Sequence, residues 1–426
     1  MPLVKHSPKR RPALLTLTCA AALVGVFGVS AAAQPATWNF TQAGVPAAQP
    51  LGGGGAGVVV AVVDAWVDGS SAAEFGGRVL AGANCTSGTC TAGPASADDC
   101  VHGTHVAGTI ASTDYGVAPE AKILPVQVLT FANGECQGSD TAVAAGIDWA
   151  TMHGAQVINL SLGDVPITGI GVIDGLFHDS TVDAAVARAA AAGVVVVASA
   201  GNDSATTPSY QVGNALLIAA TGPTGALASY TDSGGGTSVA APGGDFGSDG
   251  QCHPETCVLS TEPGGKTGLL AGTSMAAPHV SGLAALLIAE HPDRGRADVF
   301  TTIETTAKPL PGAGHGLIDA AAALLVRPPS AAPSAALHFT GCRKTVTATK
   351  GTRATIHCAL GPATANVLVT LQQVHGKGWI TIATTKTDAK GAFTLRSKAI
   401  RATTRLRLVV RKTLTLPVTA KVANAR

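Results

Sequence analysis

The chain has 426 residues, of which 46% are hydrophobic and 13% are charged. This length exceeds one average domain, and the apolar content excludes an intrinsically disordered protein. The formal net charge of +2 conceals an uneven distribution. Residues 34–337 carry 8 basic and 25 acidic residues, a net charge of −17, whereas residues 338–426 carry 16 basic residues and one acid, a net charge of +15. The charge pattern therefore predicts an acidic body followed by a basic domain.

Residues 1–33 have the organisation of a secretory signal peptide. Four Lys and Arg residues and no acid accompany an apolar stretch from Ala13 to Val29, and three alanines at 31–33 provide a small-residue cleavage site. The alternative is a retained membrane anchor, because the apolar stretch is nearly long enough to cross a bilayer. We expect a secreted, extracellular protein that meets a membrane only transiently, through its signal peptide.

Export gives the nine cysteines a structural meaning. Cys19 leaves with the signal peptide, and eight cysteines remain for an oxidising compartment. Their spacing favours local closures, which leave the two remaining cysteines to pair with each other. The predicted pairs are Cys85–Cys90, Cys252–Cys257, Cys342–Cys358 and Cys100–Cys136. Zinc is the competing interpretation, but the sequence contains no Cys-x-x-Cys, and we expect no metal site.

Between residues 57 and 323, short β-branched runs alternate with longer Ala-rich segments. The runs 58–63, 123–128, 157–162 and 194–198 are typical of strands buried on both faces. The segments of helical length are 104–112, 141–153 and 181–192. This alternation predicts an α/β fold, in which helices flank a parallel sheet on both faces. Residues 232–249, rich in Gly, Ser and Asp, are predicted as a loop.

A Pro/Ser/Ala linker at 327–336 divides the chain into a domain of residues 34–326 and a domain of residues 337–426. Beyond the linker, Thr and Val alternate with polar residues at a period of two. The predicted strands are 367–374, 379–387, 392–398 and 405–416. Turns that contain Gly or Asp separate them, a pattern typical of a small antiparallel, immunoglobulin-like β-sandwich.

Three apolar segments each place one polar residue where packing alone would not require it. Asp64 ends the buried run VVVAVVD, at the strand end where parallel sheets gather ligands and catalytic groups. His102 begins HGTHVAGTI, a segment of helical character. Ser274 lies in GTSMAAPHVSG, and Pro278 is tolerated only near the start of a helix. The Ser274 hydroxyl is therefore expected at a helix N-terminus, where developing negative charge is favoured.

Together these segments resemble the subtilisin-like (subtilase) family of serine endopeptidases, over roughly residues 38–326. HGTHVAG and GTSMAAPH are among the most specific motifs of that family, and they occur in its order Asp, His, Ser. The segments VINLSLG, SAGND, VAAPG and GLIDAAAAL match its intervening blocks. The resemblance implies a subtilisin-like fold and hydrolysis of polypeptide substrates through an acyl-enzyme.

The resemblance also implies a role for individual residues. Asp64, His102 and Ser274 match the catalytic triad, and Asn202 with the Ser274 backbone N–H matches the oxyanion hole. A serine hydroxyl is too weak an acid to attack an amide unaided, so a histidine must take its proton. The residues that match the lining of the substrate cleft are Ser161, Leu162, Gly163, Ala200 and Gly201. His105 and His279 follow the motifs on their helices and are interpreted as packing residues.

Three features depart from the family's usual pattern. Ala65 and Trp66 follow Asp64, where the family has a small residue and Gly. No segment has the length of the family's prodomain. The loop that often binds a structural calcium ion in the family is shortened. We expect no required cofactor, although acidic loops such as those with Asp245 and Asp249 leave room for a weak structural calcium ion. The alternative function is a catalytically impaired subtilase-fold protein for binding or adhesion, targeted by its basic C-terminal domain.

The basic domain suggests a partner of opposite charge. We expect an anionic surface or glycan, with two alternatives: charges that only keep the sandwich soluble, and docking onto the acidic body of the same chain. Nucleic acid is disfavoured as a partner, because Trp379, Phe339 and Phe393 offer little surface for base stacking.

Overall fold

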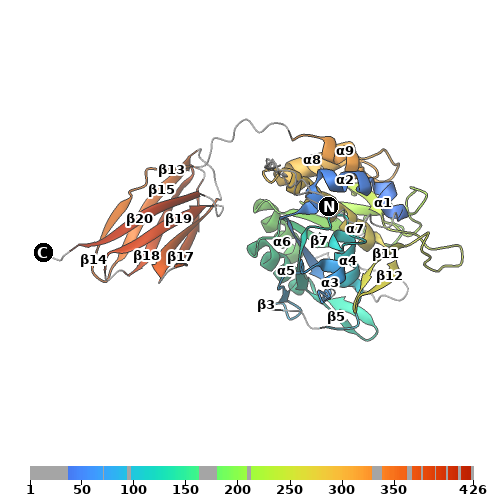
Figure 1. The fold of residues 1–426 in the computed structure, drawn as a ribbon, viewed down its shortest axis with the longest axis horizontal. Coiled ribbons are helices and arrows are strands. Elements are labelled where there is room, and N and C mark those ends of the chain that lie inside the picture. Colours follow the sequence, from blue (N-terminus) through green and yellow to red (C-terminus); the bar gives the residue numbers. More distant parts are fainter. Residues whose placement is uncertain are drawn as a thin grey trace, which may run out of the picture. The chain divides into compact units, whose positions relative to one another are not determined.

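The computed structural model describes residues 37–423, except for 71, 94–96, 163–179, 209–212, 329–337, 362–366, 376–377, 389, 400–401 and 411–413. The described residues form two compact units that divide between Leu324 and Leu325, and each unit is described by itself (Figure 1). The predicted signal peptide (1–33) and most of the predicted linker (327–336) lie outside the described residues.

Unit 1 is built around an eight-stranded sheet of order β10-β9-β8-β7-β1-β4-β2-β3. Its strands are β1 (Val59–Asp64), β2 (Ala83–Asn84), β3 (Thr91–Ala92), β4 (Lys122–Gln127), β7 (Val157–Leu160), β8 (Val195–Ser199), β9 (Leu216–Thr221) and β10 (Val239–Pro242). Every neighbouring pair is parallel except β2 with β3. The predicted parallel sheet is thus confirmed, but β10 occupies part of the segment 232–249 predicted as a loop, because a run of four residues carries no clear period.

Two hairpins of unit 1 lie outside the central sheet. They are β5 (Leu129–Ala132) with β6 (Glu135–Gly138), and β11 (Val258–Glu262) with β12 (Lys266–Leu270).

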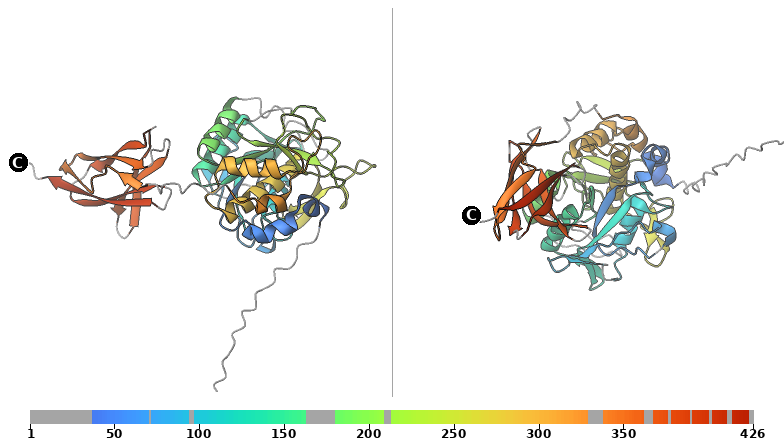
Figure 2. Two further views of the ribbon diagram at one scale, coloured as in Figure 1. Left: turned by 90° about the horizontal axis from the view of Figure 1, so that it is seen from above. Right: turned by 60° about the vertical axis from the view of Figure 1, so that its left-hand side comes forward.

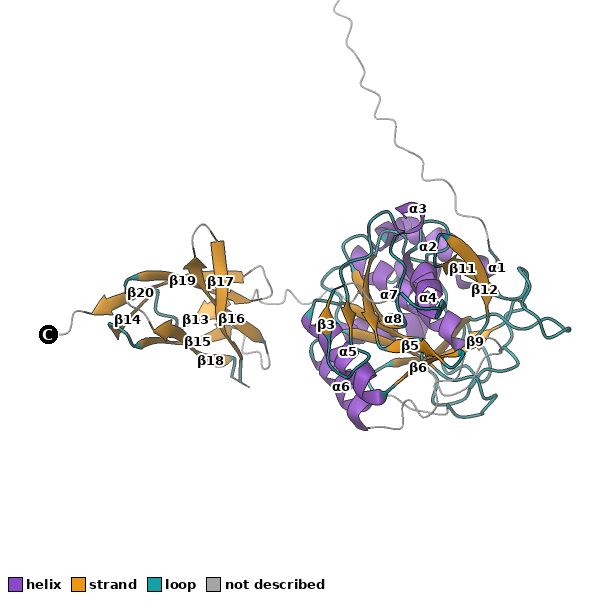
Figure 3. Ribbon diagram, turned by 90° about the horizontal axis from the view of Figure 1, so that it is seen from below, coloured by secondary structure: helices purple, strands orange, loops and turns teal. Residues whose placement is uncertain are grey.

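Helices flank both faces of the central sheet, as predicted (Figure 3). They are α1 (Trp38–Ala43), α2 (Val45–Leu51), α3 (Ala72–Phe75), α4 (His102–Ala111), α5 (Asp140–Met152), α6 (Ser180–Ala191), α7 (Thr273–Glu290), α8 (Arg296–Thr306) and α9 (Ala320–Leu325), with a 3-10 turn η1 (Gly53–Gly55). Successive side chains of β1 alternate between two cores: Val60 and Val62 pack with α4 and α7, whereas Ala61 and Val63 pack with α5 and α6. This alternation explains why β1 is apolar at every position but the last.

Helix α7 is enclosed in the core. Every residue from Thr273 to Ile288 is buried, as expected for a helix that is apolar around its circumference. Pro278 lies inside this helix rather than at its first position, where proline is best tolerated. A proline has no N–H to donate to the carbonyl four residues earlier, so the Ser274 carbonyl oxygen loses its partner within the helix.

Unit 2 is a small β-sandwich, as predicted, of a three-stranded sheet (β13-β15-β18) and a five-stranded sheet (β14-β20-β19-β16-β17) (Figure 2). The strands are β13 (His338–Thr340), β14 (Thr345–Thr349), β15 (Arg353–Gly361), β16 (Leu368–His375), β17 (Gly378–Lys386), β18 (Ala392–Ala399), β19 (Thr404–Val410) and β20 (Leu414–Ala423). Ile356, Leu371, Phe393 and Leu408 belong to its core.

The topology of unit 2 corrects two details of the prediction. The run 405–416, predicted as one strand, belongs to β19 and β20, which pair antiparallel. Its alternation continues without a Gly, Pro or Asn to mark a turn, so the sequence offers no signal for a break. In addition, β14 pairs with β20 in parallel, so the sandwich is not purely antiparallel.

All four predicted disulfides are present. Cys85–Cys90, Cys100–Cys136 and Cys252–Cys257 lie in unit 1, and Cys342–Cys358 lies in unit 2. Among the described helices, none combines the length and the apolar character needed to cross a membrane.

Candidate active site

Asp64 and His102 form a buried hydrogen-bonded pair where β1 ends and α4 begins. The His102 Nδ1–H donates to Asp64 Oδ1 over 2.8 Å, and the same oxygen accepts from the Ala65 backbone N–H over 2.7 Å. Gly103 makes the approach of these two elements possible, because a Cβ atom there would lie 2.6 Å from the Ala65 carbonyl oxygen. Since a carboxylate only accepts, the proton of the neutral imidazole is on Nδ1 and the lone pair is on Nε2.

Burial and charge act in opposite directions on the His102 imidazole. Asp64 is 0% exposed and His102 is 6% exposed. Burial alone would lower the pKa of His102, but the charge of Asp64 and its hydrogen bond raise that pKa above the ordinary value of 6.5. The pair therefore favours an imidazole that accepts a proton more readily than a free histidine does.

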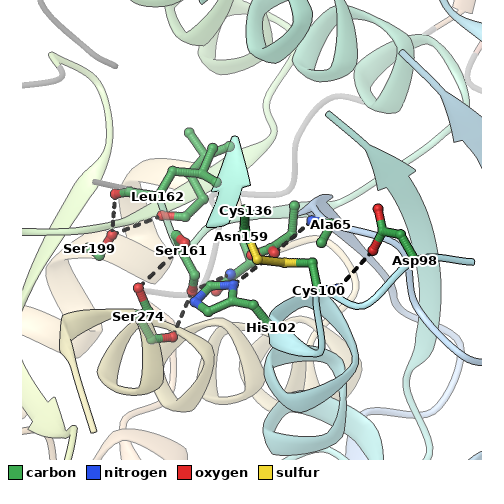
Figure 4. Close-up of polar contacts among 12 residues, drawn as sticks. Ala65, Asp98, Cys100, His102, Cys136, Asn159, Ser161, Leu162, Ser199 and Ser274 are labelled. Atoms are coloured by element: carbon green, nitrogen blue, oxygen red, sulfur yellow. Dashed lines mark hydrogen bonds and ion pairs between the residues drawn. A yellow bond between two sulfur atoms is a disulfide. The ribbon is translucent and has the colours of Figure 1, made fainter. Parts of the chain in front are cut away.

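Ser274 lies in the first turn of α7 and is 8% exposed. Figure 4 shows its side chain pointing toward the His102 imidazole. The Ser274 Oγ lies 3.5 Å from the Ser161 carbonyl oxygen, the upper limit for a hydrogen bond, so that contact holds the hydroxyl only weakly. The free N–H groups and the dipole of the α7 N-terminus favour negative charge at this position.

A chain of buried polar groups holds the backbone of Ser274. The Ser161 hydroxyl donates to the Ser274 carbonyl oxygen over 2.7 Å and thereby replaces the partner that Pro278 removes. The Asn159 Nδ2 donates to that hydroxyl over 2.8 Å, and the Ser281 hydroxyl donates to Asn159 Oδ1 over 2.7 Å. The end of β7 is thus connected to α7 at two positions, two turns apart.

Asn202 is oriented by Thr273, the first residue of α7. Its Oδ1 accepts from the Thr273 backbone N–H over 2.9 Å and from the Thr273 hydroxyl over 3.0 Å. Because a backbone N–H only donates, the atom that faces it must be the amide oxygen. The donor end of the amide, Nδ2, therefore points away from these contacts.

The predicted cleft residues follow β7 and β8. Ser161, Leu162, Ala200 and Gly201 are buried, and Gly163 lies outside the described residues. The Ser199 hydroxyl donates to the Leu162 carbonyl oxygen over 2.6 Å, which joins the ends of the two strands. The Gly201 N–H donates to the Thr273 hydroxyl, and its carbonyl oxygen accepts from the Asp232 N–H, so both polar groups of Gly201 bond within the fold.

Trp66 supports the segment that precedes His102. Its Nε1–H donates to the Asp98 carbonyl oxygen over 2.8 Å, and the indole is half-buried. The Asp98 carboxylate accepts from the Cys100 backbone N–H over 3.0 Å, and the disulfide from Cys100 to Cys136 anchors the same segment. The indole therefore packs beside the loop 98–101, and the hydrogen bond from His102 to Asp64 forms in its presence.

The two other histidines of the motifs have no carboxylate partner. His105 Nε2 lies 3.2 Å from the Val258 carbonyl oxygen, and burial lowers the pKa of His105 to about 3. Asn39 donates to His279 Nε2, His279 Nδ1 donates to the Met275 carbonyl oxygen, and burial lowers the pKa of His279 to about 4. Both imidazoles are neutral packing groups in the core.

The acidic loops have partners within the protein. The Asp245 carboxylate accepts from the Ser229 hydroxyl over 2.7 Å, and Asp249 pairs with His253 over 2.9 Å. Among the described residues, no group of three or more His, Cys, Asp or Glu side chains is arranged to hold a metal ion. The weak structural calcium ion stays a prediction.

Three residues of the site carry no role in the sequence-based interpretation: Asn159, Ser281 and Thr273. Asn159 had a usable signal, since it is a polar residue inside the apolar run of a buried strand. Ser281 and Thr273 had none, because a serine or threonine in an Ala-rich helix is common.

Comparison with known proteins agrees with this geometry. The sequence profile of the subtilase family matches residues 55–339. Subtilisin BL from Lederbergia lenta is 34% identical over 301 residues, which are 68% of this chain and 99% of that protein. M-protease from Shouchella clausii is 35% identical over 305 residues, covering 69% of this chain and 71% of that protein.

Solved structures show the same relationship. A protease from Pseudoalteromonas arctica superposes with a TM-score of 0.58 at 30% identity, over 69% of this chain and 99% of that one. Fervidolysin from Fervidobacterium pennivorans, a keratinolytic enzyme related to subtilisin, superposes with a TM-score of 0.54 at 28% identity, over 86% of this chain and 55% of that one. The chain therefore belongs to the subtilase family and is a subtilisin-like serine protease.

Proposed function

We propose that this protein is a secreted serine endopeptidase in which Asp64, His102 and Ser274 form the catalytic triad. The observation that carries the proposal is the buried 2.8 Å hydrogen bond from His102 Nδ1 to Asp64 Oδ1. With its Nδ1 proton held in this way, the imidazole presents the Nε2 lone pair as a base. Ser274, in the first turn of α7, is the nucleophile.

In the proposed reaction, His102 Nε2 takes the Ser274 hydroxyl proton as Oγ bonds to the peptide carbonyl carbon. The Asp64 carboxylate stabilises the resulting imidazolium. The tetrahedral oxyanion accepts hydrogen bonds from the Ser274 backbone N–H and from Asn202 Nδ2. The imidazolium then protonates the amine as the C–N bond breaks, and water, activated by His102, hydrolyses the acyl-enzyme and restores the Ser274 hydroxyl.

The hydrogen bonds of Asn202 support its role as an oxyanion donor. Thr273 holds the amide oxygen, so Nδ2 does not have to rotate into position when negative charge develops. Such a fixed donor contributes to catalysis because no reorganisation is needed during the reaction. The polypeptide would bind in extended form along the ends of β7 and β8, at Ser161, Leu162, Gly163, Ala200 and Gly201. Gly201 would supply no main-chain hydrogen bond to it, because its N–H and carbonyl oxygen already bond within the fold.

Secretion is supported by the signal-like residues 1–33 and by four disulfides. The chain that follows is anchored on unit 1 from Trp38 onward: the Trp38 indole donates to the Cys257 carbonyl oxygen, and Asn39 donates to His279. Cleavage after residue 33 would leave both contacts intact.

The first prediction concerns the triad itself. The secreted protein should be labelled by a fluorophosphonate probe and should digest casein, and Ser274→Ala and His102→Gln should abolish both. His253→Gln is the matched control, because it removes the histidine of a second His–Asp pair, which is exposed. Normal melting temperatures would show that the variants fold. If the wild-type protein is neither labelled nor active, the proposal fails and a binding or adhesion function takes its place.

The second prediction concerns pH. The free enzyme needs a neutral His102, so kcat/KM should rise with pH through an apparent pKa above 6.5, because Asp64 raises the pKa of His102. A profile of kcat/KM against pH with a short peptide substrate measures this value. Asp64→Asn should lower both the apparent pKa and the rate, and His253→Gln should change neither. An apparent pKa below 6.5 in the wild-type enzyme would contradict the assignment.

The third prediction concerns Ser161 as a positioning residue. Ser161→Ala removes the donor to the Ser274 carbonyl oxygen, and we expect kcat to fall about tenfold, equivalent to about 1.4 kcal/mol, with KM little changed. Ser260→Ala is the matched control, because the buried Ser260 hydroxyl donates to the carbonyl oxygen of His105, on α4, over 2.8 Å. Equal losses of kcat in the two variants would show a general structural effect instead.

The fourth prediction concerns the indole that follows the catalytic aspartate. Trp66→Gly removes the hydrogen bond to Asp98 and the packing beside the loop 98–101, so we expect a lower melting temperature and no gain in kcat. Trp66→Phe keeps an aromatic ring but has no N–H to donate, so its melting temperature should lie between those of the wild-type protein and Trp66→Gly. A large increase in kcat for Trp66→Gly would instead show that the indole impairs the triad.

A further inference from the structure

Unit 2 contains a groove of about 440 Å³ between the strands β17 and β18. These are the edge strands of the two sheets, so the groove lies where the sandwich is open. Ile382 and Ala383, which are partly exposed, provide its accessible apolar surface. Edge strands usually carry charge or are covered, since an open edge invites pairing with other chains.

Three cations line this groove: Arg353 from β15, and Arg396 and Lys398 from β18. The side chains of Arg396 and Lys398 point outward, because they alternate with the buried Leu395 and Ser397. All three cations are exposed. They therefore face solvent together on the three-stranded sheet and its open edge.

The positive charge in the groove is not neutralised within unit 2. In the described part of the chain, none of these three side chains forms a hydrogen bond or an ion pair. The single acid of residues 338–426 is Asp388, and its carboxylate accepts from the backbone N–H groups of Lys390 and Ala392. An anionic ligand would therefore meet cations that do not have to break an existing contact.

The remaining lining identifies the class of anion. Thr384 and Thr385 contribute hydroxyls, which can donate to and accept from sugar hydroxyls, whereas the Thr394 hydroxyl already bonds to His357. Planar guanidinium groups bind carboxylates through paired hydrogen bonds, and the apolar surface can pack against sugar rings. No aromatic residue lines the groove, which disfavours stacked nucleic-acid bases. A phosphate polymer would accept hydrogen bonds from the cations and from the hydroxyls, but it has no sugar ring to pack on the apolar surface.

We propose that the groove between β17 and β18 binds an anionic polysaccharide with carboxylate groups, through Arg353, Arg396 and Lys398. The groove belongs to unit 2 and uses no residue of the protease site, so this binding function is independent of the proposed catalytic mechanism. It would hold the protease on a carboxylated polymer while unit 1 cleaves nearby polypeptides.

The test uses the full chain with Ser274→Ala, which prevents proteolysis, and measures the Kd for polygalacturonate at several salt concentrations. The triple variant Arg353→Gln/Arg396→Gln/Lys398→Gln should weaken binding at least about tenfold at low salt. The dependence of log Kd on log salt should also fall in slope by about 2, as expected when about three contacts to the polyanion are lost. The control Arg343→Gln/Arg405→Gln/Lys421→Gln removes the same charge from exposed positions outside the groove and should have a much smaller effect.

Three further results decide the proposal. Methyl-esterified polygalacturonate, which keeps the sugar and loses the charge, should not bind measurably. Equal weakening by the two triple variants would overturn the proposal in favour of diffuse attraction to the whole basic unit. Tighter groove-dependent binding of polyphosphate or single-stranded DNA would identify a different ligand class and would also overturn it. In a chain that keeps Ser274, the groove triple variant should cleave a soluble peptide at the rate of the wild-type protein. This result separates the test of the groove from the test of the catalytic proposal.

Discussion

The enclosure of α7 is the constraint on which the rest of unit 1 depends. A helix that is buried from Thr273 to Ile288 has only one stable place, against a sheet that offers an apolar face over several strands. That place brings its N-terminus to the carboxyl ends of the parallel strands, where β1 ends in Asp64. The packing of α7 in the core therefore positions Ser274.

The low-polarity core also affects the three buried histidines of unit 1 differently. His102, His105 and His279 are all buried, and burial disfavours the charged imidazole at each of them. Of these three, only His102 lies beside a carboxylate, and this charge raises its pKa. The pKa of His105 falls to about 3 and that of His279 to about 4. One neighbouring carboxylate thus separates a histidine with a raised pKa from two histidines with lowered pKa values.

The charged residues divide the chain into an acidic part and a basic part. The net charge of −17 belongs to residues 34–337 and that of +15 to residues 338–426, so the overall value of +2 reflects neither. In unit 2 a single acid accompanies the cations, and the sandwich must keep them in solvent or offer them to an anion. Attraction over long distances would be screened beyond about 8 Å at physiological salt, so specific binding needs a shaped surface such as the groove.

Sequence alone determined the parallel sheet and the β-sandwich, because burial period is a property of neighbouring residues. Local cysteine spacing predicted three of the disulfides, and elimination predicted the fourth, Cys100–Cys136. Sequence also determined the candidate residues Asp64, His102 and Ser274, since their motifs are specific. Only the tertiary structure decided the contacts between distant segments: Ser161 meets the Ser274 carbonyl across 113 residues, and Ser281 meets Asn159 across 122. It likewise decided that 405–416 becomes two strands and that cations of β15 and β18 share a groove. Periodicity reports whether a position is buried, but the partner that a buried polar group finds depends on how the elements pack.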